Sequence, residues 1–238
     1  MLAAQSATEL RLALRNGEQV LLTLLIPIVL LVGLTALAVV PLPEPRVAAV
    51  TPGVLALAVM STAFTGQAIA LGFDRRYGVI RRLAATALPR WLLVAGRLVA
   101  VLGIVALQVA VLSALAAGLG WRPEPSGIGW ALLLVLLGCA AFGALGILLG
   151  GSLRAEVTLA VANLVWFVLL LAGGIVIPLD ALPGPLAAVG AYLPSGALAE
   201  GLRTALAAGQ APVLSHVLVL LGWTAVAGGL ALRTVKLR

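Results

Sequence analysis

The chain has 238 residues, of which 63% are hydrophobic and 10% are charged, and its formal net charge is +7. A soluble domain is about 45–50% apolar and about 25% charged, so this chain has too few polar side chains to cover a water-exposed surface. The same numbers exclude intrinsic disorder, and the single cysteine excludes a disulfide scaffold. We therefore expect an all-α polytopic membrane protein. Its excess of basic residues is expected to relate to orientation in the bilayer, and we expect no nucleic-acid partner.

Residues 1–19 form a predicted amphipathic helix that lies in the plane of the membrane interface. Leu10 and Leu14 recur on one helical face, while Arg11 and Arg15 fall on another. This spacing is typical of a helix whose apolar side faces lipid and whose charged side faces water.

Six segments are long and apolar enough to span a bilayer, which takes about 20 mostly apolar residues. Arg97, near the start of the third segment, is the one charged residue within them. An even number of spans places both termini on the same side of the membrane. The predicted spans are Val20–Val40, Pro52–Phe73, Trp91–Leu119, Ile128–Gly150, Val157–Ile177 and Pro212–Leu232.

The positions of the basic residues predict which side that is. With the N-terminus in the cytoplasm, Arg46, Arg122 and Arg203 lie outside and the other twelve basic residues lie inside, while the acids divide evenly. Cytoplasmic loops carry an excess of Lys and Arg. We therefore expect both termini to be cytoplasmic, in a plasma or inner membrane, and the arginine- and alanine-rich composition points to a bacterial source.

The segment 74–90, between the second and third predicted spans, is predicted to hold a short cytoplasmic helix. Gly78 is expected to end the preceding span, Leu83 contributes to an apolar helical face, and Pro89 stops the helix. Five of the seventeen residues are arginine. Two interpretations stay open: the helix docks in a groove of a partner protein with its arginines at the rim, or it anchors the chain to anionic lipid headgroups.

The segment 178–211 is too apolar for a plain external loop. Leu186 and Val189 follow a helical spacing, and Ser195 is expected to cap a second short helix that carries Leu198. The sequence thus predicts a hairpin of two short amphipathic helices that dips into the outer leaflet before the last span.

Several kinds of chemistry lack the residues that they need. All eight acids fall in loops or tails, which disfavours ion-coupled transport. His216 has no partner for metal binding or nucleophilic catalysis, and the one lysine, Lys236, is at the wrong place for a phosphate-binding loop. We expect a protein that is not an enzyme and that binds no metal, ATP or other cofactor itself.

Polar side chains within the predicted spans are few, and three of them are candidates for a substrate path. These are Gln67, Gln108 and Asn163. Each can equally hydrogen-bond a neighbouring helix, which contributes about 1 kcal/mol or less. The sequence leaves both alternatives open.

Four segments together resemble the permease subunits of type-2 ABC exporters, a class that includes bacterial drug, antibiotic, polysaccharide and lipid exporters. Two departures stand out: Asp74 replaces the Glu that is common in the family, and Thr86 and Pro89 are separated where the family has a Thr-Pro pair. The four segments cover the chain in family order and are Glu9–Pro27, Asp74–Arg90, Gly173–Pro183 and Tyr192–Arg203.

This resemblance implies a single domain over residues 1–238 that pairs with a second copy or a sister permease. It further implies two ABC ATPase subunits, which hold ATP and Mg, and membrane lipid as surroundings. The cargo would be a hydrophobic or amphipathic compound such as a drug or antibiotic; the alternatives are a lipid, a lipid-linked glycan or haem, or a non-transport anchoring or assembly protein. The implied ATPase-coupling residues are Asp74, Arg75, Arg76, Gly78, Arg81, Arg82, Leu83, Glu9, Arg11 and Arg15.

Overall fold

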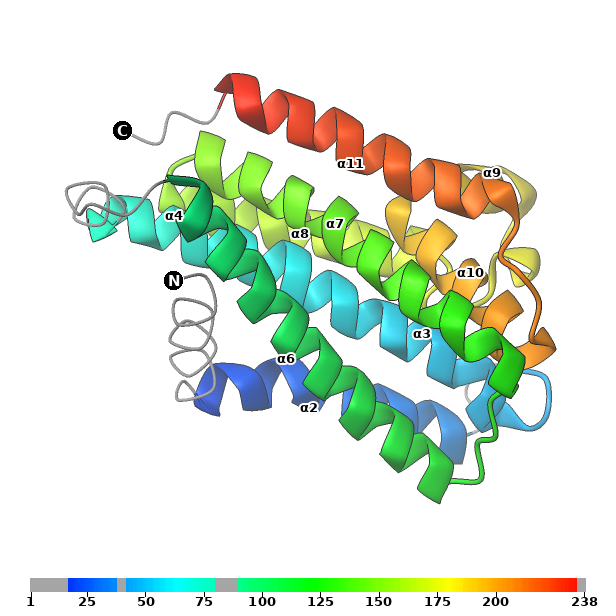
Figure 1. The fold of residues 1–238 in the computed structure, drawn as a ribbon. Helices are drawn as coiled ribbons and strands as arrows, with labels where there is room; N and C mark the ends of the chain where they lie inside the picture. The colour runs from blue at the N-terminus through cyan, green and yellow to red at the C-terminus, as the bar shows by residue number, and fades with distance from the viewer. Residues whose placement is uncertain (1–16, 38–41, 80–89, 235–238) are drawn as a thin grey trace.

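The computed structural model describes residues 17–37, 42–79 and 90–234, and throughout these ranges the regular structure is helical (Figure 1). The long helices are α2 (Gly17–Ala36), α3 (Arg46–Met60), α4 (Gln67–Arg76), α6 (Arg90–Gly118), α7 (Ile128–Ser152), α8 (Ala155–Ala172), α10 (Pro194–Ala208) and α11 (Leu214–Thr234). A π-helical segment, η1 (Ser61–Gly66), joins α3 to α4. The short elements are the 3₁₀ turns η2 (Pro125–Gly127) and η3 (Leu179–Ala181) and the helix α9 (Gly184–Tyr192).

Five helical stretches in the described ranges are long and apolar enough to cross a membrane. They correspond to the second through sixth predicted spans. The first predicted span corresponds to α2, whose apolar part, Thr23–Ala36, is shorter. The five stretches are Arg46–Arg76, Gly96–Gly118, Pro125–Ser152, Ala155–Ala172 and Leu214–Thr234.

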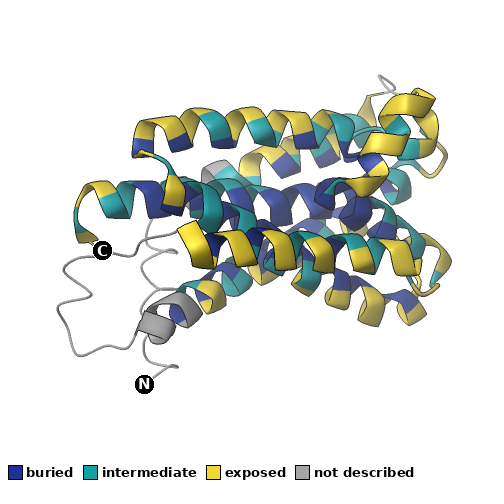
Figure 2. Ribbon diagram, turned by 90° about the horizontal axis from the view of Figure 1, so that it is seen from above, coloured by how far each residue is buried: buried dark blue, intermediate teal, exposed yellow. Residues whose placement is uncertain are grey.

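The stretch Arg46–Arg76, built from α3, η1 and α4, is the central helix of the bundle. Its most apolar 18 residues are 83% buried, whereas the equivalent part of α11 is 17% buried. It packs against α2, α6, α7 and α10 through α3, and against α7 and α8 through α4. Figure 2 shows the consequence: buried residues run along the centre, while the surrounding helices expose their outer faces. A helix that is apolar on all sides is one that other helices enclose.

The central helix is longer than the predicted span, because Pro52 lies inside it and does not begin it. Helices inside membranes tolerate proline where nearby side chains satisfy the freed backbone groups. The missing Pro52 N–H frees the Ala48 carbonyl, and the Thr51 hydroxyl donates to the neighbouring Val47 carbonyl over 2.6 Å. At the other end, the helix continues through the three charged residues that were assigned to a loop, and it ends at Arg76.

The bundle has two distinct ends (Figure 1). The start of α2 and the ends of α4, α7 and α11 lie at one end, together with the starts of α6 and α8; we call this the arginine end. The helices α9 and α10 lie at the opposite end, which we call the hairpin end. The segment 17–19, predicted as part of an interfacial helix, belongs to α2, and the rest of that predicted helix lies outside the described ranges.

At the hairpin end, α10 is a packed part of the core. Leu198 and Leu202 are fully buried, and α10 contacts α3, α7 and α11, whereas Val189 on α9 is exposed. The prediction that Ser195 caps the second helix was wrong. Pro194 is the first helical residue, and its fixed φ suits that position, so Ser195 is carried into the first turn and buried.

The helix α8 ends five residues before the predicted span does, at Ala172. Gly173 follows it, and Gly174 has a φ of +66°, a left-handed conformation that ends a helix and that glycine adopts without steric cost. The chain then turns toward α10, so residues 173–177 belong to the hairpin end.

Candidate functional site

The predicted coupling residues that the structure describes are Asp74, Arg75, Arg76 and Gly78, and all four lie at the arginine end where α4 stops. Gly78 has a φ of +69° just after the helix, in agreement with the prediction that it ends the span. Six further predicted coupling residues lie outside the described ranges: Glu9, Arg11, Arg15, Arg81, Arg82 and Leu83.

Asp74 joins α4 to α6 through Arg97. The Arg97 Nη1 donates to the Asp74 carboxylate over 2.9 Å, and its Nε donates to the Gln67 side-chain oxygen over 2.8 Å. Both charged side chains are partly buried. The one charge within a predicted span is therefore neutralised by an acid from the neighbouring helix, which is how membrane proteins usually accommodate such a residue.

Arg75 joins α4 to the C-terminal end of α7. Its Nη1 donates to the carbonyls of Gly150, at 2.9 Å, and Leu153, at 3.3 Å. The last carbonyls of a helix have no partner within the helix, and the C-terminus carries partial negative charge, so a cation there is favourable. Arg75 thus holds the end of the central helix against α7.

Arg76 forms an ion pair with Glu156 at the start of α8, and its guanidinium lies 5.9 Å from the centre of the Tyr77 ring. Both partners of the pair are about half exposed, so water screens the pair and we expect only a small contribution to stability. The last turn of the central helix therefore contacts α6, α7 and α8 through three consecutive side chains.

An open cleft of about 590 Å³ lies between the ends of α4, α7 and α8. Its charged lining residues come from the end of α4 and the start of α8. The lining residues are Gly72, Arg75, Arg76, Ser152, Leu153, Arg154, Ala155 and Glu156.

The three polar residues proposed from the sequence as a substrate path lie on three different helices. Gln67 accepts from Arg97. Gln108 on α6 is fully buried, and its amide bonds Thr62 at 2.8 Å and Thr23 at 3.2 Å. Asn163 on α8 is exposed and donates to a carbonyl of its own helix. The structure does not bring the three together.

The π-helical segment η1 is a polar junction that the sequence analysis missed. Thr62 bonds Gln108 of α6, and Ser61 accepts from the Trp166 indole of α8 over 2.9 Å. A π-helix inside an α-helix is rare and occurs often at functional sites. The sequence feature from which this junction could have been predicted is the cluster of Ser61, Thr62 and Thr65 within an apolar stretch.

We expect the Gln108→Leu variant to lower the free energy of unfolding by about 1 kcal/mol, because hydrogen bonds between membrane helices average about 0.6 kcal/mol and this amide makes two. The Asn163→Leu variant is the matched control, since among the described residues the Asn163 side chain bonds Leu159 of its own helix. Thermal unfolding of the purified proteins in one detergent compares them. Equal loss in both variants would contradict the role assigned to Gln108.

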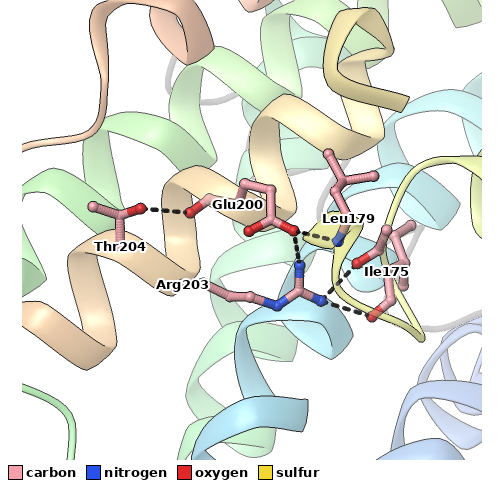
Figure 3. Close-up of polar contacts among 6 residues, drawn as sticks. Ile175, Leu179, Glu200, Arg203 and Thr204 are labelled. Atoms are coloured by element: carbon pink, nitrogen blue, oxygen red, sulfur yellow. Dashed lines mark hydrogen bonds and ion pairs between the residues drawn. The ribbon is translucent and has the colours of Figure 1, made fainter. Parts of the chain in front are cut away.

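A second charged cluster at the hairpin end was also missed, because the sequence analysis counted Arg203 only as an external charge. Arg203 donates to the Glu200 carboxylate over 2.6 Å and to the carbonyls of Gly174, at 2.6 Å, and Ile175, at 3.2 Å (Figure 3). The Glu200 carboxylate also accepts from the backbone N–H of Leu179 over 3.0 Å. The cluster ties α10 to the segment that follows α8.

The Arg203 guanidinium is one of the more enclosed charges at this end of the bundle, with 14% of its side chain exposed. Burial lowers the pKa of Arg203 from the ordinary arginine value, and the adjacent Glu200 carboxylate acts in the opposite direction. The spacing of Glu200 and Arg203, three residues apart on a helix, was the signal from which this pair could have been predicted.

The described part of the chain is a bundle of helices, five of which are long and apolar enough to cross a membrane. Residues 3–207 match the family described as "ABC-2 type transporter". The chain therefore belongs to this family of multi-pass membrane permeases, which lack the ATPase site and pair with ABC ATPase subunits.

A relative in Bacillus subtilis (strain 168) carries the name "Putative transport permease YvfS". The two chains are 25% identical over 227 residues, which cover 94% of this chain and 92% of the relative. The resemblance stated from the sequence is thus confirmed at the level of the family. Neither comparison identifies a cargo.

Proposed function

We propose that this chain is the membrane-spanning subunit of an ATP-driven exporter, and that the arginine end is where its ATPase subunits act. The observation that carries the proposal is the central helix. Its most apolar 18 residues are 83% buried, and its last turn contacts α6, α7 and α8 through Asp74, Arg75 and Arg76. A displacement of the segment that follows this turn would therefore be passed to three surrounding helices as well as to the central one.

Three features of the complex follow from the proposal. The helix α2 serves as the sixth span, together with adjoining residues at its ends. The arginine end faces the cytoplasm, which the excess of basic residues there supports. Two ATPase subunits bind there, and a second copy of this chain or a sister permease completes the transport path.

The proposed cargo is a hydrophobic or amphipathic compound, with drugs and antibiotics as the first candidates. The outward faces of α6, α8 and α11 are apolar, and away from the helix ends the described spans carry no charge that could hold a strongly anionic cargo. A lipid, a lipid-linked glycan or haem would use the same architecture. Membership in a transporter family favours transport over the anchoring alternative.

The proposal is tested with the Arg82→Glu variant, because a reversed charge in the segment 74–90, predicted from the sequence to dock, should weaken ATPase binding. Tagged wild-type protein is purified gently from its native membrane, and co-purifying proteins with Walker motifs are quantified by mass spectrometry. We expect about a tenfold lower ATPase yield for the variant, equivalent to about 1.4 kcal/mol of binding free energy.

The Arg122→Glu variant is the matched control, because Arg122 is exposed at the hairpin end and undergoes the same change of charge. It should retain the wild-type ATPase yield. Absence of an ATPase from the wild-type preparation would contradict the proposed function. Equal losses in both variants would contradict the assignment of coupling to the arginine end.

A further inference from the structure

The cleft at the arginine end carries more positive charge than its own acid can neutralise. Arg75, Arg76 and Arg154 line it, against one carboxylate from Glu156. Its formal charge is therefore +2, in an opening of about 590 Å³. A concave surface of this sign concentrates anions.

The three arginines differ in how many contacts their side chains already make within the protein. Arg75 donates to two carbonyls of α7, and Arg76 is paired with Glu156. The Arg154 side chain makes no hydrogen bond or ion pair with any residue in the described part of the chain, although it lies near Glu156. Its guanidinium presents five N–H donors in a planar fork that matches two phosphate oxygens.

The backbone at the start of α8 adds donors to the same wall. Ala155 is the first helical residue, and no side chain caps this end of the helix. Ala155 and Glu156 both line the cleft, so the first-turn N–H groups lie beside Arg154, and the Glu156 carboxylate accepts from its own backbone N–H. The arginines supply most of the positive charge of the cleft, and the N-terminal end of α8 adds to it.

An apolar stripe on α8 leads away from the cleft along the bundle. Its members, spaced by seven, four and three residues, lie on one helical face and are 45–68% exposed: Val157, Leu164, Val168 and Leu171. A phosphate bound at the cleft would thus sit at the end of a surface suited to a hydrocarbon chain. A free inorganic phosphate would gain nothing from this stripe.

We propose that the cleft binds the phosphodiester headgroup of an anionic phospholipid, with Arg154 as its main ligand and the acyl chains along α8. The site lies where α4 and α7 end and α8 begins, and lipid headgroups lie at the level where membrane-spanning helices end. This lipid site does not depend on the proposal that ATPase subunits bind at the arginine end, because none of its residues needs a partner protein to bind a lipid.

The test measures thermal unfolding of the purified full chain in a neutral detergent, with phosphatidylglycerol, phosphatidylcholine or inorganic phosphate titrated in. We expect phosphatidylglycerol to stabilise the wild-type protein, with much weaker effects of the other two. In the Arg154→Gln variant the apparent affinity for phosphatidylglycerol should fall about tenfold, the loss expected for one charge-assisted bidentate contact. Arg154→Lys should restore part of it.

The matched control is Arg233→Gln, since Arg233 is exposed in the last turn of α11 at the same end of the bundle. This variant should keep the wild-type affinity within about twofold. Equal losses in the two variants would overturn the proposal in favour of a general surface-charge effect. Equal stabilisation by inorganic phosphate would overturn the lipid assignment, and equal stabilisation by phosphatidylcholine would overturn the anion site itself.

Discussion

The Arg203→Met variant is expected to lower the free energy of unfolding by about 3 kcal/mol, at the low end of the range for breaking a buried ion pair, because both partners keep some exposure. Methionine fills much of the same space but donates nothing. It leaves the Glu200 carboxylate without its cation and the carbonyls of Gly174 and Ile175 without their donor. Unfolding in mixed micelles titrated with sodium dodecyl sulfate, followed by tryptophan fluorescence, measures the change.

The matched control is Arg122→Met, since Arg122 is exposed at the same end of the bundle and is without a hydrogen bond to any described residue. This variant should change stability by less than about 0.5 kcal/mol, as is usual for surface substitutions. A loss in the control as large as that in the Arg203 variant would show that removal of positive charge, and not of these contacts, causes the effect.

The second large effect is expected from Gly150→Ala, which should lower the free energy of unfolding by about 2 kcal/mol. A Cβ at Gly150 would collide with the backbone of Ala68, so α7 must move away from the central helix. The same movement would lengthen the hydrogen bond from Arg75 to the Gly150 carbonyl. The mixed-micelle titration described above measures this loss.

Gly143→Ala provides the control within the same helix. Gly143 is also in α7, but a Cβ there meets no atom within 4 Å. Alanine has the higher helix propensity by about 1 kcal/mol, so this variant should be as stable as the wild type or slightly more stable. A loss of stability at both positions would mean that the close approach of α7 to α4 is not what makes Gly150 sensitive.

The existence of the long helices was predictable from the sequence because a bilayer requires about 20 consecutive apolar residues, whatever those residues pack against. Hydropathy does not predict which helix the others enclose, because lipid and protein interiors are equally apolar. The central position of Arg46–Arg76 is therefore a result that only the structure gives.

Helix boundaries were less predictable because tertiary contacts set them. The span containing Pro52 starts earlier than expected, at Arg46, whose guanidinium donates to the carbonyls of Leu34 and Leu37 at the end of α2. The span ending near Ile177 stops earlier, at a glycine pair whose turn is held by Arg203. Neither contact follows from local sequence.

The roles of the arginines were the least predictable part of the candidate site. A count of basic residues treats each as a signal of orientation, yet three of them satisfy carbonyls at the C-terminal ends of other segments. Arg46 bonds carbonyls at the end of α2, Arg75 those of α7, and Arg203 those just after α8. Their partners are 9 to 78 residues away in sequence, so spacing alone does not reveal the pairs.

The π-helical segment in the central helix has a consequence for sequence comparison within the family. Its six residues form a π-helix, with hydrogen bonds from i to i+5 where an α-helix has them from i to i+4. The wider turn therefore holds one more residue than the α-helical turn that would replace it. A homologue that lacks one residue between Ser61 and Gly66 would keep the same faces of α3 and α4 toward their neighbours, with a continuous α-helix between them. A one-residue gap in an alignment at this point therefore indicates that the homologue lacks the π-helical turn. It does not indicate that the helix carrying Asp74 and Arg75 has rotated relative to its neighbours.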